Sequence, residues 1–155
     1  MSGARLELTR GQILAFRRRV GALDERLPRG PASLRRAAWV GLQDSMPRAA
    51  LLSIHARVEG TQPSTWEDPT LVQLWGPRYS AYVVARRDVA LFTLGRLPDD
   101  DRSRRTAIDV AARVGAILGD ARMSDAEVAR ALGDHPNKMR YAAPTGTVLI
   151  RWDGA

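Results

Sequence analysis

The 155-residue sequence has no cysteine, which excludes disulfide bonds, thiolate catalysis and zinc ribbons. Its two histidines, His55 and His135, are too few for a dedicated transition-metal site. The sequence has neither a glycine-rich phosphate loop nor a metal-ligand spacing, so we expect neither a cofactor nor a metal. Charged residues interrupt every apolar stretch well before the roughly 18 residues of a transmembrane helix. No apolar segment typical of a secretory signal occurs near the N-terminus, and these absences together favour a cytoplasmic protein.

Basic side chains outnumber acidic ones by 24 to 17, which gives a net charge of +7 and an isoelectric point near 11.1. Lys138 is the only lysine, so the other 23 cations are arginines. A GC-rich genome would produce this bias without any functional cause. However, the planar guanidinium group binds phosphate in a bidentate way, so nucleic acid is the first partner to test. No predicted helix has a wholly basic face opposite aromatic residues, which argues against a membrane partner.

Caps and apolar spacing predict three helices in the first part of the chain, over residues 9–23, 33–42 and 47–60. The first begins with a capping box formed by Thr9 and Gln12. Its apolar residues recur at spacings of three and four, which is typical of a helix with one buried face.

The middle of the chain contains the first predicted strand, over residues 80–84, where β-branched and aromatic residues cluster. A short helical piece is expected after Pro69, before that strand, and Asp88 is expected to cap a short segment after it. An acidic run over residues 98–101 marks a boundary. Helices on both sides of a strand, without regular alternation, predict the α+β class.

The predicted elements after this boundary follow the order of a winged helix-turn-helix. A long helix over residues 108–118 precedes two short helices over residues 124–132 and 137–142, the first of which begins with a capping box formed by Ser124 and Glu127. A strand over residues 147–150 then leads to an Asp-Gly hairpin turn at residues 153–154 that has no returning strand. We therefore expect the chain to stop inside a domain, leaving an unpaired apolar strand through which copies could self-associate.

Three segments carry a resemblance to a known family. Residues 40–57, VGLQDSMPRAALLSIHAR, and residues 75–84, WGPRYSAYVV, followed by Asp88, resemble the bacterial winged-helix DNA-binding family that includes the AlkZ and YcaQ DNA glycosylases. Residues 140–154 are similar to the second winged helix of that family. The resemblance covers nearly the whole chain in register.

This resemblance implies a tandem winged helix-turn-helix fold that is mostly helical with short β strands. Residues 1–97 would form the first winged-helix unit. Residues 98–155 would form a partial second unit whose wing is truncated. Members of the family are longer than this chain and usually contain three such units, so we expect the chain to correspond to an N-terminal portion.

In the glycosylases of this family, a Gln-x-Gln or Gln-x-Asp motif is linked to catalysis. Its second member positions or activates water against the sugar carbon as the damaged base leaves. Gln43 matches the first position, Ser45 occupies the second, and Asp44 lies between them. Serine is a poor base, and on a helix Asp44 would point about 100° away from its neighbour. In a loop, Asp44 could reach the site instead.

Three interpretations of the function follow. The resemblance implies a DNA glycosylase that excises alkylated or crosslinked bases, with Gln43, Asp44 and Ser45 as its catalytic candidates. The serine at the second motif position favours a non-catalytic DNA-binding module, either regulatory or vestigial. The truncated wing fits a scaffold that needs another chain for completion.

Six basic or polar side chains are candidates for contacts to double-stranded DNA: Arg48, Arg57, Arg78, Asn137, Lys138 and Arg140. The first two flank the helix after the glutamine motif, a region that the family presents to DNA. The third lies in the family's strand segment. The last three lie on the predicted recognition helix, where donors reach phosphates or base edges, although in some family enzymes this helix packs against neighbouring units.

The expected location is the bacterial cytoplasm, in association with the nucleoid.

Overall fold

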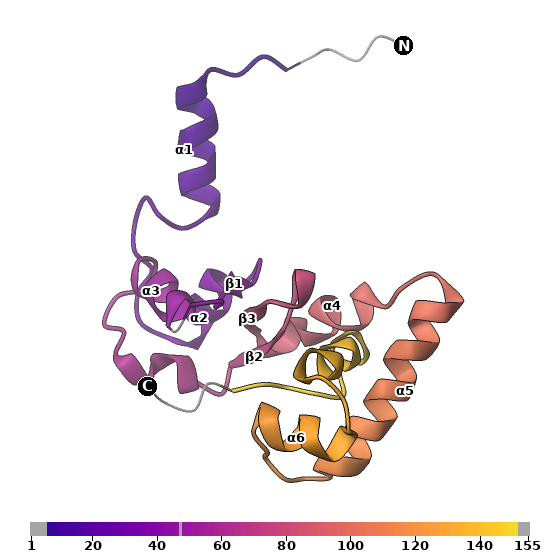
Figure 1. Cartoon of the computed structure of the whole chain (residues 1–155). Coiled ribbons are helices and arrows are strands. Elements are labelled where there is room, and N and C mark those ends of the chain that lie inside the picture. The colour runs from indigo at the N-terminus through magenta and orange to yellow at the C-terminus, as the bar shows by residue number, and fades with distance from the viewer. Residues whose placement is uncertain (1–5, 47, 152–155) are drawn as a thin grey trace.

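A three-stranded antiparallel sheet lies in the middle of the chain, with helices before and after it (Figure 1). The computed structural model describes residues 6–46 and 48–151. The strands β1 (Leu42–Gln43), β2 (Leu71–Trp75) and β3 (Ala81–Ala85) are arranged in the order β1-β3-β2, so β3 is central. Helices on both sides of this small sheet confirm the expected α+β class.

A first core forms between this sheet and the helices on its N-terminal side. These helices are α2 (Pro31–Ala37), α3 (Ala49–His55) and the 3₁₀ helix η1 (Pro63–Glu67). The cluster of buried side chains comes from α2, α3, the residues just after them and the sheet, while η1 contributes none: Leu34, Ala37, Ala38, Leu42, Ala50, Ile54, Val58, Leu71 and Val83.

A second core is built mainly by the elements after the sheet. The 3₁₀ helix η2 (Pro77–Tyr79) connects β2 to β3, and the elements after β3 are η3 (Arg86–Asp88), α4 (Val89–Phe92), η4 (Leu94–Arg96), α5 (Asp101–Leu118), α6 (Asp125–Leu132) and η5 (Pro136–Thr145). The buried members of this core are Trp75, Ala111, Val114, Val128, Ala129, Leu132, Met139, Ala142, Ala143 and Val148. Because Trp75 ends β2, the second core reaches the sheet.

Side-chain caps begin three of the helices, and those at Thr9 and Ser124 lie where the sequence predicts them, whereas α5 begins at Asp101, ahead of the predicted helix over residues 108–118. Thr9 forms the expected capping box at the start of α1 (Arg10–Val20), and Ser124 forms another with Glu127 at the start of α6. Asp100, in the acidic run, accepts a hydrogen bond from the backbone N–H of Ser103 and so caps α5. Each cap satisfies backbone donors that the first helical turn leaves free.

Helix α1 stands apart from the rest of the chain, connected to it by a loop (Figure 1). It contains no buried residue, and Phe16 is 66% exposed. The prediction of a helix here is confirmed, but its apolar row does not form part of either core. The spacing of apolar residues predicts that α1 forms, but whether its apolar face becomes buried depends on what other elements pack against it.

The predicted second and third helices are shorter than the sequence suggests. α2 ends at Ala37, and Leu42 pairs with Val83 as part of β1. After the turn that follows α2, Gly41 has a φ of +75°, a backbone conformation that redirects the chain into the strand. α3 ends at His55.

The helical piece expected after Pro69 is wrong, because residues 71–75 form β2. All five side chains of β2 are buried, so no alternation of polar and apolar residues marks it as a strand. The prediction of a strand over residues 80–84 is confirmed by β3, shifted by one residue.

The predicted helix over residues 137–142 lies within the 3₁₀ helix η5, and one other expectation about the C-terminal region needs correction. The terminal segment is not an unpaired strand, because the backbone N–H of Ile150 donates to the carbonyl of Gln73 at 3.1 Å and Val148 is buried. The proposed route to self-association through a free strand therefore fails. The predicted hairpin turn at residues 152–154 lies outside the described residues.

None of the helices within residues 6–46 and 48–151 has both the length and the apolar character needed to cross a membrane.

Candidate functional site

The glutamine motif lies on β1 and the turn after it, and its side chains point alternately outward and inward. Gln43 and Ser45 are exposed, whereas Asp44 is only 4% exposed. Side chains in extended backbone alternate between faces, so the first and third motif positions share one side. The helical geometry considered from the sequence does not apply here. Gln43 Nε2 donates a hydrogen bond to Ser45 Oγ at 2.8 Å, which joins the two outward side chains.

The buried carboxylate of Asp44 binds two other parts of the fold. Its Oδ1 accepts a hydrogen bond from the backbone N–H of Ala50, in the first turn of α3, at 2.9 Å. Its Oδ2 accepts one from Gln73 Nε2, on β2, at 2.7 Å. The backbone N–H of Asp44 donates to the carbonyl of Ala81 at 2.7 Å. The carboxylate is therefore turned away from the surface on which Gln43 and Ser45 lie.

Gln73 is a functional neighbour that the motif analysis missed. It lies in the middle of the buried strand β2 and is 7% exposed. A buried amide requires hydrogen-bond partners, so a glutamine within the apolar stretch LVQLW is the signal that would have indicated a polar contact. The sequence does not indicate which residue that partner is.

The outward pair offers a limited chemistry. The Gln43 side-chain oxygen can accept a hydrogen bond, and the Ser45 hydroxyl, which accepts from Gln43, keeps its own proton to donate. Together they can hold a water molecule or a polar group of a ligand. Neither is a general base near neutral pH.

Arg48 and Arg57, which flank the sequence of α3, are used differently. Arg48 is exposed at the start of the helix, with a φ of +65°. Arg57 is half-buried: its Nε donates to the carbonyl of Gly21 at 2.8 Å, and its Nη1 donates to that of Ser53, also at 2.8 Å. Arg57 therefore holds the loop after α1 against α3, while Arg48 keeps its guanidinium in solvent.

Arg78 lies at the turn between β2 and β3 and is exposed. Both Arg78 and Tyr79 have a φ of +56°, a left-handed conformation that costs non-glycine residues energy. The turn is closed by backbone hydrogen bonds, among them one from the N–H of Gly76 to the carbonyl of Ser80 at 2.8 Å and one from the N–H of Tyr79 to the carbonyl of Gly76 at 3.1 Å. The strained turn projects the arginine from the end of the sheet.

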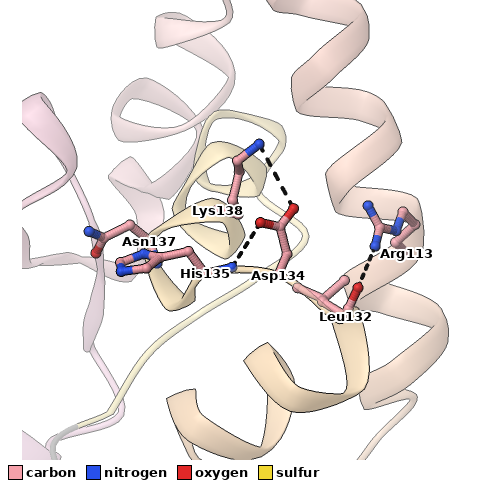
Figure 2. Close-up of polar contacts among 6 residues, drawn as sticks. All are labelled: Arg113, Leu132, Asp134, His135, Asn137 and Lys138. Atoms are coloured by element: carbon pink, nitrogen blue, oxygen red, sulfur yellow. Dashed lines mark hydrogen bonds and ion pairs between the residues drawn. The ribbon is translucent and has the colours of Figure 1, made fainter.

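The N-terminal part of η5 presents polar groups to solvent, as Figure 2 shows. Asn137 and Lys138 are both exposed, and the Lys138 ammonium lies 3.8 Å from a carboxylate oxygen of Asp134. The same carboxylate accepts a hydrogen bond from the backbone N–H of His135 at 2.8 Å, and His135 Nδ1 accepts one from the N–H of Asn137. These short-range contacts define how η5 begins.

Arg140 is less exposed than these two residues. It is half-buried, and its guanidinium carbon lies 5.9 Å from the ring centroid of Trp75 on β2. Of the two roles considered for this helix, packing against neighbouring structure therefore describes Arg140. Asn137 and Lys138, in contrast, are exposed to solvent.

Other arginines that the sequence does not single out also bind backbone carbonyls. Arg113 Nη2 donates to the carbonyl of Leu132 at 2.7 Å and so satisfies the C-terminal end of α6 (Figure 2). Arg96 Nη1 donates to the carbonyls of Trp75 and Phe92 at 3.0 and 3.1 Å. Burial lowers the pKa of the Arg96 guanidinium, and the nearby Tyr79 and Tyr82 oppose this shift. Part of the arginine excess is therefore structural.

The structure joins Gln43 to Ser45, leaves Arg48, Arg78, Asn137 and Lys138 exposed, and uses Asp44, Arg57 and Arg140 in internal contacts. Across the described residues, no group of three or more His, Asp and Glu side chains is placed to hold a metal ion.

Comparisons with known proteins agree with the resemblance of the motifs. Residues 34–151 match the sequence model of the family described as DNA glycosylase AlkZ-like. No curated protein matches the chain significantly. The fold is similar to a solved structure of the Streptomyces sahachiroi DNA glycosylase AlkZ, with a TM-score of 0.60 and 15% sequence identity. That match covers 92% of this chain but only 43% of the solved chain.

Proposed function

The chain belongs to the AlkZ-like family of DNA glycosylases, and on this premise we propose that it binds double-stranded DNA and releases alkylated or crosslinked bases. The contact between Gln43 and Ser45 carries the proposal, because it places two polar groups on one exposed side of β1. Since the chain spans less than half of the solved relative, the activity of a complete enzyme is part of this proposal. The proposed location is the bacterial cytoplasm, in association with the nucleoid.

A tandem winged-helix architecture accounts for the arrangement of elements. In the first unit, residues 1–97, the order α2-β1-α3-η1-β2-β3 and the sheet order β1-β3-β2 support a helix-turn-helix followed by a wing. In the second unit, residues 98–155, α5, α6 and η5 supply the helices. In the same unit, Ile150 forms an antiparallel bridge with Gln73 of β2 and so contacts the first sheet.

The proposed reaction needs little acid–base catalysis. Alkylation at a ring nitrogen gives the base a positive charge, so the base leaves as a neutral molecule when the bond to the sugar carbon breaks. A water oxygen then bonds to that carbon and releases a proton to solvent. Gln43 and Ser45 would orient this water, with the Gln43 side-chain oxygen accepting a hydrogen bond from it. The buried Asp44 does not take part directly.

DNA contacts are proposed for the exposed candidates. Arg48 and Arg78 are free to neutralise phosphates near the glutamine motif, and Asn137 and Lys138 present donors from the second half. The remaining candidates, Arg57 and Arg140, would stabilise this surface rather than contact DNA, because their guanidinium groups form contacts within the protein. Phosphate neutralisation releases condensed counterions, so this binding should weaken with salt.

The test measures base release and DNA affinity together. A duplex containing 7-methylguanine should acquire abasic sites in the presence of the protein, and Gln43→Ala should suppress them, whereas an unmodified duplex should remain intact. With roughly two to four phosphate contacts, affinity should fall about 10- to 100-fold between 50 and 200 mM salt. Affinity that is insensitive to salt would contradict the electrostatic interface.

A non-catalytic DNA-binding module is the second candidate, and Ser45 favours it because a hydroxyl replaces the amide or carboxylate of the family motif. The two candidates differ in one outcome. Salt-sensitive binding to duplex DNA without base release above the buffer background would identify the module.

A further inference from the structure

We infer that Asp44 and Gln73 are positioning residues for the exposed pair Gln43 and Ser45, an inference that rests on the proposed function. Asp44 is the residue between the two members of the pair, and its buried carboxylate is bound on both oxygens. The direction in which the outward side chains point is therefore determined by contacts on the inward side of the same segment.

The ordinary strand interactions are too few to orient this segment. β1 contains only two residues and lies at the edge of the sheet, so it pairs with β3 alone. The carboxylate adds contacts in two further directions, to the backbone of Ala50 on α3 at 2.9 Å and to Gln73 on β2 at 2.7 Å. Rotation of the segment about its own axis would break both bonds.

The chemical nature of the side chain matters for this role. Hydrogen bonds to a carboxylate are shorter and stronger than neutral ones, and they have a defined direction. Among the described residues no salt bridge includes Asp44, so amide donors surround its carboxylate. An apolar residue could fill the same space but would leave the N–H of Ala50 and the amide of Gln73 without this acceptor.

Loss of either partner should therefore move Gln43 without removing any DNA-binding group. At saturating DNA, we expect Asp44→Asn and Gln73→Met to lower the rate constant of base release roughly 10- to 100-fold, because misplacement by about 1 Å has effects of this size. The dissociation constant for duplex DNA should stay within about twofold, since the arginines are unchanged. Val114→Ala, a substitution in the second core, is the control for reduced stability alone.

A second readout does not depend on catalysis. The side-chain NH₂ group of Gln43 donates to Ser45 and should give two well-separated proton resonances in NMR spectra of the complete chain. We expect both to move towards the values of a free glutamine in Asp44→Asn and Gln73→Met, and to stay in place in Val114→Ala.

The outcomes distinguish a failure of the positioning role from a failure of the proposed function. Unchanged Gln43 resonances in both network variants would overturn the positioning role, as would an equal loss of rate in Val114→Ala. If the unsubstituted protein releases no base, the proposed function fails, and the resonances still decide whether Asp44 and Gln73 orient the pair.

Discussion

The rings of Tyr79 and Tyr141 meet edge to face, with their centroids 5.5 Å apart and their planes at 86°. Tyr79 belongs to the turn between β2 and β3, and Tyr141 belongs to η5, so the contact joins the sheet to the last helical element. The guanidinium of Arg96 lies 6.0 Å from the Tyr79 ring centroid and donates to the carbonyl of Trp75. An aromatic and cationic cluster thus joins the turn between β2 and β3 to η4 and η5.

The first prediction concerns this contact. A double-mutant cycle with Tyr79→Leu and Tyr141→Leu should give a coupling free energy of about 0.5–1.5 kcal/mol, measured by urea unfolding. Tyr141 is 39% exposed, which favours the lower part of that range. Additive effects of the two substitutions would show that the rings do not stabilise one another.

Removal of the charge should affect stability at Arg57 and DNA binding at Arg48. Arg57→Met leaves the carbonyls of Gly21 and Ser53 without their donor and should lower the free energy of unfolding by about 1–3 kcal/mol. Arg48→Met should change it by less than about 0.5 kcal/mol while weakening DNA binding. Thermal unfolding and a DNA titration of both variants provide the comparison. Equal losses of stability would contradict the assignment of Arg57 to the fold.

Arg78→Gly should increase stability and reduce DNA affinity at the same time. Glycine removes the left-handed strain at a φ of +56°, a gain of about 1 kcal/mol relative to Arg78→Ala, which keeps the strain. Both variants lose the same guanidinium, so their DNA affinities should fall equally. A lower melting temperature for the glycine variant than for the alanine variant would show that the turn stores no such strain.

Two glycines with positive φ should differ in their tolerance of a methyl group. A Cβ at Gly41 would lie 2.6 Å from Phe92 Cε1, whereas a Cβ at Gly133 meets nothing within 4 Å. Gly133→Ala should cost about 1 kcal/mol of backbone strain, and Gly41→Ala about 2–4 kcal/mol, because overpacking adds to the strain. Chemical denaturation of both variants tests this difference. Similar costs would indicate that the Phe92 ring moves aside without loss.

The cap of α6 predicts a dependence of stability on pH. Hydrogen bonds from the Ser124 side chain and backbone hold the pKa of Glu127 below its usual value of 4.5. Its carboxylate therefore stabilises the fold above that value, and this contribution disappears as the pH falls through the lowered pKa.

Melting temperatures of the unsubstituted protein and Glu127→Gln should differ at pH 7 and converge in acid. Glu59→Gln, at an exposed position, serves as the control for a general loss of one negative charge. A difference that persists unchanged to low pH would show that the ionised cap is not its cause.

Much of the helical structure could be predicted from short stretches of sequence. The capping boxes at Thr9 and Ser124 form as expected, because a cap and the backbone groups that it satisfies lie within three residues of each other. The strand β3 was also recognisable from its β-branched residues. In contrast, β2 escaped detection, because both of its faces are covered and its pattern lacks alternation.

Only part of the candidate site could be predicted from the sequence. The motif resemblance identifies Gln43 and Ser45, and the family match agrees with it. The sequence does not reveal that Asp44 is buried, because its partner Gln73 is 29 positions away along the chain. Nor does it separate arginines that face solvent from those that bind carbonyls, as Arg57 does through Gly21 at a separation of 36 positions.

The sequence by itself therefore determined the absence of cysteine chemistry, the arginine-rich charge, the capped helices and the family motif. These properties depend on composition or on neighbours within one helical turn. Only the tertiary structure decided that Asp44 supports the motif from within, that Arg140 packs on Trp75, and that Ile150 pairs with β2. Each of these contacts joins segments distant in sequence, and their geometry exists only once the cores have brought those segments together.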